Sequence, residues 1–520
     1  MTVVNLQVKS SYTLLESPIK VKDLVQQAAE MNYSAIALTD HNVLYGAVEF
    51  YQAAKKYGIQ PIIGLTLDAE GFTNASVTYP LILLAKDFRG YQALIKLSSY
   101  QRKAQEAVSL ERIKELSSSL IVIVPTLQSE LHQLYLGHKE EAIRELVADI
   151  AAQFPDSFLG ISPEQEHTFV QLLEAGGGKL VALGDVQYLK AEDAFATEVL
   201  KAIDRGQPVD RQADLTGEYA LKTPEEFSAV FHKMGLQKAV DRTALIADRI
   251  DIELPLGQQL LPKYQTPEQM DADSYLRQLA EEGLRRRIVD VTEDYRERLD
   301  KELSVISTMG FSDYFLIVWD IMTYARREQI ETGFGRGSAA ASLVAYALEI
   351  TNIDPIEYDL LFERFLNEQR YTMPDIDLDF PDNKRDKILQ YVRDTYGDEH
   401  AAQISTFSTL AAKSSVRDTL RVFGADSEEM KQWSQAIPTS QQRHISLEIA
   451  YEESASLREL VARSNRNKQI FQIAKTIEGL PRNVSTHAAG VVISDIPLEE
   501  NVPLQLGSGE LLTTQYTGRY

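Results

Sequence analysis

The segment Met373–Phe380 carries an acidic residue at every second position. Its acids are Asp375, Asp377 and Asp379, and the residues that alternate with them are apolar. Because successive side chains of an extended chain point to opposite sides, this alternation predicts a strand with one acidic and one apolar face. Neighbouring carboxylates on that face lie roughly 6.6 Å apart along the chain, which is close enough to share a cation.

Carboxylates held this close raise each other's pKa and cost stability unless a cation lies between them. Hard oxygen donors with no His or Cys nearby favour Mg²⁺, which binds one or two carboxylates together with substrate phosphates. The segment therefore predicts phosphoryl or nucleotidyl transfer. The alternative is a half-buried strand with a solvated acidic face. An EF-hand loop is disfavoured, because Phe380 stands where that loop needs Gly and Asp386 stands where it needs Glu.

A length of 520 residues exceeds one ordinary core and predicts about three domains. The absence of cysteine excludes disulfides and thiolate metal sites, and it is compatible with a reducing cytoplasm. The first residues do not resemble a signal peptide, and no apolar run is long enough to cross a bilayer, so we expect a soluble protein without a membrane partner. A net charge of −23 argues against indiscriminate coating of nucleic acid, although a basic cleft remains compatible with it.

Strand-like and helical segments alternate from residue 3 to about residue 190, which predicts a βα barrel. In such barrels the functional residues lie where strands end. Asp40, His41 and Asp185 occupy positions of this kind.

The order of these strands, with TDHN after the second and GDVQYL near the end, resembles the polymerase-and-histidinol-phosphatase (PHP) metal-dependent barrels over residues 1–265. Where that family has a His-x-His pair, this chain has Asn5 and Lys9, and two further ligand positions carry Thr66 and Gln187. The positions that keep a donor are Asp40, His41 and Asp185. We therefore expect a scaffold with no metal in the barrel. The alternatives are a PHP metallophosphoesterase with a residual metal on the histidine, or a simple His–Asp hydrogen bond.

A glycine-rich loop, Thr332–Ser338, follows amphipathic helices and leads into an apolar run expected to be a helix. Glycines let the backbone approach a phosphate, a helix N-terminus offers free N–H groups, and Arg336 adds charge-assisted hydrogen bonds. Alone, such a loop is more often a helix start capped by Ser338. Together with the acidic strand it predicts a triphosphate site, because one element holds pyrophosphate and the other holds the metal. Arg364 lies between them in sequence and can reach the same phosphates.

Five motifs, GRGSAAASLVAYAL, DLLFERFLNEQR, MPDIDLDF, TFSTLAAKSSVRD and STHAAGVVI, resemble in this order the bacterial C-family replicative DNA polymerases, the alpha subunits of DNA polymerase III. The resemblance covers the whole chain and implies a polymerase-beta-like nucleotidyltransferase palm. The implied nucleotide-binding residues are Arg336, Gly337, Ser338 and Arg364. The implied catalytic acids are Asp375 and Asp377, as ligands of two Mg²⁺ ions, with Asp379 on the same face ranked third.

Lys413, Arg417 and Arg421 recur at every fourth residue of a predicted helix, so they share one face. They are candidates for binding DNA phosphates, and the alternative is a solvated face. Arg482 and His487 open the expected return of the chain to the palm and are further DNA-binding candidates. A hydrogen bond to the backbone explains His487 equally well.

The fold class that we expect is multidomain α/β, with a PHP-type distorted βα barrel followed by an α+β palm and a helical thumb. The expected domains are the barrel (1–265), the first part of the palm (266–425), the thumb (426–482) and the return to the palm (483–520). In the family, the third palm acid follows a segment like TTQY, so we expect a truncated N-terminal portion that is inactive by itself.

The resemblance also implies what the complete protein does. It implies a DNA-directed DNA polymerase of the replisome, which acts on primer-template DNA and dNTP in the bacterial cytoplasm, in association with the nucleoid. The sliding clamp and other replisome subunits are implied as partners through regions beyond residue 520. For the chain itself, the competing expectation is a non-catalytic scaffold or binding fragment.

Overall fold

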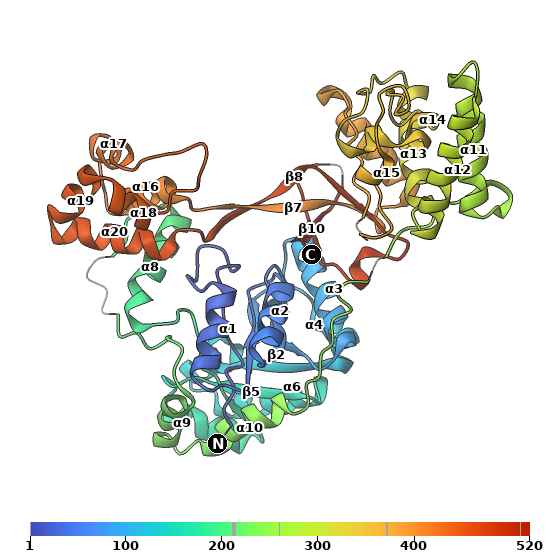
Figure 1. Ribbon diagram of the computed structural model, residues 1–520. Helices are drawn as coiled ribbons and strands as arrows, with labels where there is room; N and C mark the ends of the chain where they lie inside the picture. Colours follow the sequence, from blue (N-terminus) through green and yellow to red (C-terminus); the bar gives the residue numbers. More distant parts are fainter. Residues whose placement is uncertain (1, 211–214, 259, 371–372, 510) are drawn as a thin grey trace.

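The computed structural model describes residues 2–210, 215–258, 260–370, 373–509 and 511–520 (Figure 1). It consists of a barrel that contains the N-terminus and two helical units above the barrel. A long two-stranded arm, formed by β7 (Ala401–Thr409) and β8 (Pro481–Ile493), connects the two helical units. The expected α/β multidomain architecture is therefore confirmed.

The barrel is a six-stranded sheet in the order β1-β2-β3-β4-β5-β6. Strand β3 is antiparallel to both neighbours, and the other pairs are parallel. Bridges from Asn5 to Ile36 and from Val8 to Val186 place the N-terminal segment between the two ends of the sheet and close the ring. The strands are β1 (Ala35–Leu38), β2 (Gln60–Glu70), β3 (Thr78–Ala85), β4 (Leu120–Pro125), β5 (Ser157–Ile161) and β6 (Leu180–Ala182).

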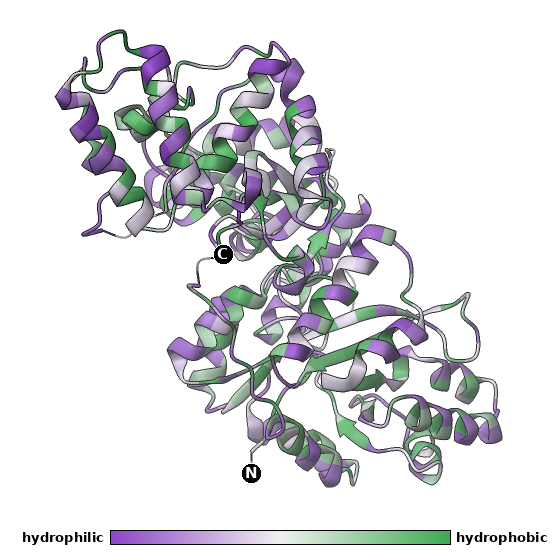
Figure 2. Ribbon diagram, turned by 90° about the vertical axis from the view of Figure 1, so that its right-hand side faces the viewer, coloured by the Kyte–Doolittle hydropathy of each residue, from purple (hydrophilic) through white to green (hydrophobic). Residues whose placement is uncertain are grey.

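Helices cover the outside of the barrel, and Figure 2 shows apolar residues concentrated on the strands that they enclose. The start of α9 at Thr223 follows from local chemistry, because Thr223 and Glu226 form a capping box and Pro224 fits the first turn. These helices are α1 (Val21–Glu30), α2 (Ala47–Tyr57), α3 (Phe88–Ala104), α4 (Leu110–Leu116), α5 (Glu130–Leu136), α6 (Glu140–Gln153), α7 (His167–Ala175), α9 (Pro224–Lys233) and α10 (Gln237–Ala247).

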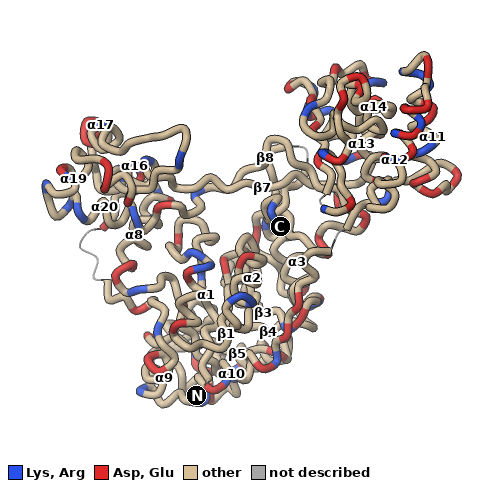
Figure 3. Tube along the Cα trace, in the orientation of Figure 1, with Lys and Arg blue, Asp and Glu red and all other residues tan. Residues whose placement is uncertain are grey.

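The second unit carries the glycine-rich loop and the acidic segment. Its core is a continuous apolar cluster in which Phe311, Phe315 and Leu343 are fully buried. Charged residues of both signs are spread over its surface (Figure 3). Its elements are α11 (Ala272–Arg287), α12 (Glu293–Thr308), α13 (Ser312–Arg327), η5 (Gly337–Ala341), α14 (Leu343–Ala347), η6 (Phe362–Arg364), η7 (Asp382–Lys384) and α15 (Arg385–Tyr396), where η denotes a 3₁₀ helix.

None of the described helices alone has the length and apolar character to cross a membrane. Only α12 and α13 reach that length and character together, and they are bent by 112° at the break between them.

The third unit is a helical cluster built around the buried indole of Trp433. Helix α8 (Ala194–Arg205), which follows the barrel strands in sequence, packs its apolar residues into this cluster. The unit therefore extends in space beyond residues 426–482. The other helices are α16 (Ala412–Val422), α17 (Ser427–Ala436), α18 (Leu447–Glu453), α19 (Ala455–Ala462) and α20 (Asn465–Ile477).

A four-stranded sheet in the order β8-β7-β10-β9 joins the arm to the barrel, where β9 is Leu504–Gln505 and β10 is Thr513–Thr517. The amide of Gln515 is fully buried at this junction. It accepts a hydrogen bond from the Leu44 N–H (2.8 Å) and donates one to Ser98 Oγ (2.9 Å). The arm is thus anchored to the barrel by polar groups that have no access to water.

Candidate active site

The acidic segment Met373–Phe380 is extended but does not pair with any described strand, so the expected strand is wrong as an element of a sheet. Backbone contacts from elsewhere hold it instead. The Ile376 N–H donates to the Tyr314 hydroxyl (3.3 Å), and the Gly333 N–H donates to the Asp379 carbonyl (3.1 Å). The predicted alternation is nevertheless present, because the apolar side chains pack on the core of the unit. These side chains are Ile376, Leu378 and Phe380.

Two of the three acids face the glycine-rich loop. Arg336 Nη1 lies 3.0 Å from Asp377 Oδ2, and Arg336 Nε donates to Asp379 Oδ1 at 3.1 Å. The hydrogen bond with Asp379 and the charge of Asp377 raise the pKa of the Arg336 guanidinium. The Asp377 and Asp379 side chains remain 40% and 48% exposed, so both carboxylates are accessible to an ion or a substrate.

Glycines let the loop approach these acids. A Cβ on Gly333 would lie 2.9 Å from Asp379 side-chain atoms, which is too close for any larger residue without rearrangement. Gly337 has a φ of +68°, a left-handed conformation that favours glycine, and its Cβ position is 3.7 Å from Asp377 Oδ2. The loop and the acids therefore form one site.

Asp375 is exposed, directly before Ile376, whose N–H contacts Tyr314. Burial raises the pKa of the Tyr314 phenol to about 12, and the charges of Asp375 and Asp377 act in the same direction. The phenol is therefore neutral at physiological pH, and it positions the segment through its hydrogen bond to the Ile376 N–H.

The structure corrects the expectation that Ser338 begins an α-helix with free N–H groups. Residues Gly337–Ala341 form a 3₁₀ helix, and the following α14 has only five residues. The first N–H groups of α14 are already bound, because the carboxylate of Glu302 accepts from Leu343 N (2.9 Å) and Val344 N (3.0 Å). A helix N-terminus is thus not available for a phosphate here, and the glycine backbone and the arginines remain as phosphate-binding groups.

The other phosphate-binding candidates line one cavity of about 390 Å³. Two segments form its walls: Gly337 and Ser338 belong to one, and Arg364, at the end of η6, belongs to the other with Asp359, Leu360 and Leu361. Within the described ranges, the guanidinium of Arg364 makes no hydrogen bond or ion pair to another side chain. The cavity therefore combines a glycine backbone with a cation that has no side-chain partner among the described residues, and both groups can bind a phosphate chain.

The donor set fits Mg²⁺. Two exposed carboxylates, Asp377 and Asp379, are held on one face, and the guanidinium of Arg336 already neutralises them as a cation would. No group of three or more acidic, His or Cys side chains encloses a metal site in the described parts of the chain. The fit rests on the two carboxylates, because Mg²⁺ takes one or two of them and completes its shell with water and substrate phosphate oxygens.

The DNA-binding candidates divide into paired and free cations. Asp418, which the sequence reasoning missed, is buried and accepts from Arg421 (3.0 Å) and Arg482 (2.7 Å). Lys413 and Arg417, on the same helix α16, have no side-chain partner among the described residues. The spacing of Asp418 from Arg421, one helical turn, was the signal that could have revealed their pairing.

His487 lies on β8 and uses Nδ1 to accept the N–H groups of Ala489 (3.0 Å) and Gly490 (2.8 Å), which is the backbone alternative expected for it. The neighbouring Ala488 carbonyl accepts from Arg385 Nε (2.9 Å), at the start of α15. This end of the arm thus reaches the unit of the acids, whereas α16 lies at the other end of the arm (Figure 1).

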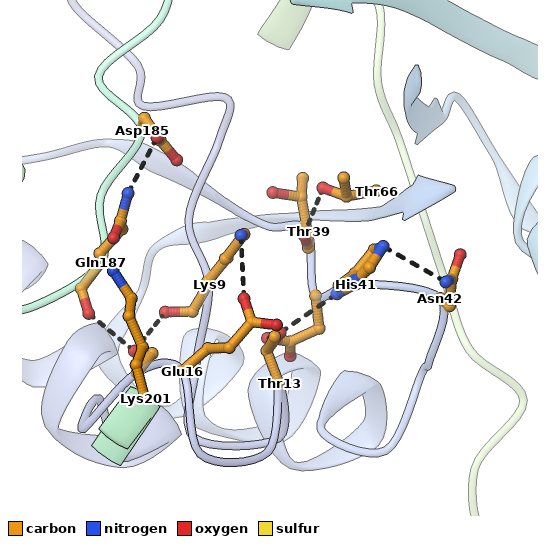
Figure 4. A network of polar contacts seen from close by, with 12 residues as sticks. Lys9, Thr13, Glu16, Thr39, His41, Asn42, Thr66, Asp185, Gln187 and Lys201 are labelled. Carbon is orange, nitrogen blue, oxygen red and sulfur yellow. Dashed lines mark hydrogen bonds and ion pairs between the residues drawn. The ribbon is translucent and has the colours of Figure 1, made fainter. Parts of the chain in front are cut away.

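The remnant residues of the barrel are engaged in hydrogen bonds with other side chains, and Figure 4 shows those around His41 and Asp185. Asp40 is buried and accepts from Ser10 and Thr13, and burial raises the pKa of its carboxyl group. Asp185 Oδ2 accepts from Gln187 Nε2 at 3.0 Å, and its other oxygen is buried without a hydrogen-bond partner among the described residues.

His41 Nε2 lies 2.8 Å from Asp68 Oδ1, and Lys9 Nζ lies 3.2 Å from Glu16. Asp68 was missed in the sequence. Its place two residues after Thr66 on one strand, and therefore on the same face, could have revealed it.

Comparisons with known proteins identify the family of this chain. The sequence-family model of the bacterial DNA polymerase III alpha NTPase domain matches residues 274–520, and the family model of the PHP domain matches residues 5–162. Over 99% of its length the chain is 43% identical to the DNA polymerase III subunit alpha of Bacillus subtilis and 40% identical to that of Halalkalibacterium halodurans. It is 38% identical over 98% of its length to the same subunit of Staphylococcus aureus.

The chain spans about half the length of these relatives, since it covers 47%, 47% and 45% of them. The matches confirm the resemblance carried by the five motifs and by the barrel. The chain belongs to the family of bacterial DNA polymerase III alpha subunits.

Proposed function

We propose that the complete protein is a DNA-directed DNA polymerase and that this chain carries its nucleotide-binding loop and two of its catalytic acids. The reaction is attack of a primer 3′-hydroxyl on the α-phosphate of a dNTP, with pyrophosphate as the leaving group. Family membership supports the reaction class, and the relatives' name supports DNA as the substrate. The sliding clamp, the other replisome subunits and the nucleoid association belong to the same proposal.

One observation carries the proposal: Arg336 joins the glycine-rich loop to Asp377 and Asp379, while the neighbouring Gly337 and Ser338 line a cavity with Arg364. Phosphate-binding groups and metal-binding groups are thus adjacent. In nucleotidyl transfer the protein contributes mainly positioning and electrostatic stabilisation, and both require this adjacency.

Within this site, Asp375 and Asp377 would hold Mg²⁺, and Asp379 is the third candidate. When bound, Mg²⁺ supplies positive charge that neutralises the phosphates and favours an ionised 3′-hydroxyl. The loop backbone at Gly337 and Ser338 binds and orients the triphosphate. Arg336 and Arg364 contribute fixed positive charge to the pyrophosphate that leaves.

Along the sequence we also propose the domain division 1–265, 266–425, 426–482 and 483–520, in which the barrel is a scaffold and in which α8 and α16 pack on the third domain. The buried hydrogen bonds of Gln515 to the barrel support a structural role for it. Lys9, at a position where PHP enzymes have a metal-binding histidine, supports the absence of phosphoesterase activity, because an ammonium group repels a metal. Within the DNA-binding proposal, Lys413 and Arg417 are free to contact phosphates.

The decisive experiment is Asp377→Asn in the full-length protein. We expect it to abolish primer extension in single-turnover assays while leaving the circular dichroism spectrum and the melting temperature unchanged. The matched control is Asp382→Asn, which changes an exposed acid five residues further along the chain and should extend primers normally. Primer extension at the wild-type rate by Asp377→Asn would refute the assignment.

A further inference from the structure

Helix α12 contacts both walls of the cavity through one side chain. Arg298 Nη2 donates to the Ala341 carbonyl (2.7 Å), at the end of the Gly337–Ala341 wall, and to the Leu360 carbonyl (2.9 Å), in the opposite wall. Both carbonyl groups belong to the cavity-lining residues. A single guanidinium group therefore bridges the two walls.

Glu302, one turn further along α12, fixes the orientation of that guanidinium. Its carboxylate is fully buried and accepts from Arg298 Nε at 2.7 Å. It also accepts from Ser342 Oγ (3.0 Å) and from the first N–H groups of α14. Because both oxygens of this buried acid have partners, the pair forms a network that connects α12, the end of η5 and the start of α14.

A third residue of α12, Lys301, contacts the segment that carries Arg364. Lys301 pairs with Glu363, which directly precedes Arg364 in the 3₁₀ helix η6. Unlike Arg298 and Glu302, this pair is exposed, with side chains 56% and 48% accessible. Helix α12 thus holds the backbone around Arg364 at two points, Leu360 and Glu363.

We propose that Arg298 and Glu302 are positioning residues that set the distance between the Gly337–Ser338 backbone and Arg364, and thereby the affinity for the triphosphate of the incoming dNTP. This inference rests on the proposed function of the cavity. Neither residue is among those that line the cavity. They act through Ala341, Leu360 and the start of α14. The Gly337–Ser338 backbone and Arg364 bind the phosphates.

The geometry requires arginine at this position. The planar guanidinium makes three hydrogen bonds in fixed directions, one to the acid and two to carbonyl groups on separate segments. Lysine keeps the charge and can pair with Glu302. Its ammonium group lacks the planar fork that lets arginine bind Glu302 and the carbonyl groups of both walls at once. Arg298→Lys therefore removes the bridge between the two walls while it keeps a positive charge beside Glu302.

The test measures dNTP incorporation by the full-length polymerase and its Arg298→Lys variant. We expect the KM for dNTP to rise about tenfold or more, as for loss of one hydrogen bond to a charged group, while kcat changes less than about threefold. The Kd for primer-template DNA should stay unchanged. Lys301→Ala, at the exposed pair, should raise the same KM by only about twofold. Arg296→Ala, which removes an exposed ion pair with Glu293 on the same helix, is the matched control and should change nothing.

A merely structural role predicts a different result. In that case Arg298→Lys lowers the melting temperature but leaves the KM for dNTP at the wild-type value, and this outcome overturns the proposal. If Arg298→Lys does not fold, the same KM measurement on Glu302→Gln and Lys301→Ala decides, and unchanged values in both would refute it. Failure of the proposed function is distinguishable, because Asp377→Asn would then extend primers normally whatever the Arg298 variants do.

Discussion

Arg336 Nη1 lies 3.0 Å from Asp377 Oδ2, so the phosphate-binding loop and the acidic segment are joined by an ion pair. The same guanidinium reaches Asp379 through Nε at 3.1 Å. A cation of the protein thus neutralises carboxylates that we assign to Mg²⁺. Because the pair is largely exposed, its net contribution to stability is small, and exchange of the guanidinium for a metal ion costs little.

This exchange predicts that Arg336→Ala strengthens metal binding while it weakens catalysis. With the guanidinium absent, the acids are free for a divalent ion, and an exposed pair of up to about 1 kcal/mol corresponds to an increase in affinity of about fivefold at most. Mn²⁺ binding to the chain, followed by electron paramagnetic resonance, measures this directly. Arg364→Ala, which does not contact the acids, is the control. Unchanged or weaker Mn²⁺ binding by Arg336→Ala would contradict the competition.

The three acids are expected to differ in importance. Asp375→Asn should lower primer extension by the full-length protein as severely as Asp377→Asn, whereas Asp379→Asn should retain measurable activity, since we rank Asp379 as the third ligand. The ion pairs of the structure favour a different order, because Arg336 contacts Asp377 and Asp379 and has no ion pair with Asp375. The three variants therefore test the ranking directly. Single-turnover rates at saturating Mg²⁺ give the order. Full activity in Asp375→Asn with none in Asp379→Asn would reverse the assignment.

The basic residues of α16 make a prediction that depends on their partners. Lys413 and Arg417 are free of side-chain partners in the described residues, whereas Arg421 is paired with the buried Asp418. Replacing Lys413 and Arg417 together by Ala should lower the slope of log K against log salt concentration by about 2 for DNA binding. Arg421→Ala should change that slope less. Fluorescence anisotropy of labelled primer-template DNA, titrated at several salt concentrations, measures both.

The sequence predicted elements well where local chemistry decides them. The alternating barrel, the capped start at Thr223 and the helix that carries Lys413 and Arg417 all follow from spacing and capping. The alternation around Asp377 also predicted correctly that the apolar residues face the core.

The errors arise where long-range contacts replace local ones. The helix expected at Ser338 gives way to a 3₁₀ turn and a short α14 because Glu302, from a distant helix, binds the N–H groups at the start of α14. The strand expected at Asp375 lacks a partner strand, since Tyr314 and Gly333 bind its backbone instead. Asp68 lies outside the motifs, and the fold brings it to His41. Asp418 ends the motif TFSTLAAKSSVRD, but its contact with Arg482 joins residues 64 positions apart, which local spacing does not predict.

The pH dependence of barrel stability follows from Asp156. Burial raises the pKa of this carboxyl group, but hydrogen bonds from Arg249 and Lys86 outweigh that effect, so its pKa is lowered in the folded state. A lowered pKa stabilises the fold above the unfolded value of about 3.9, and the contribution is lost as pH falls through the folded value. Asp156→Asn should therefore lower the melting temperature at pH 7. The difference in melting temperature from the wild type should become smaller below about pH 4. Asp149→Asn, at an exposed position of α6, should have no such dependence.

The junction between the barrel and the sheet depends on Gln515. Gln515→Ala removes the acceptor of the buried Leu44 N–H and the donor to Ser98, and a buried unpaired group costs about 1–3 kcal/mol. For a unit of this size we expect the melting temperature of the chain to fall by about 2–4 °C for each kcal/mol. Arg519→Ala, four residues away and exposed, should leave it unchanged. Because the alanine variant weakens one interface and leaves each core intact, limited proteolysis should release the barrel as a folded unit. An unchanged melting temperature and digestion pattern would show that these buried hydrogen bonds do not anchor the arm.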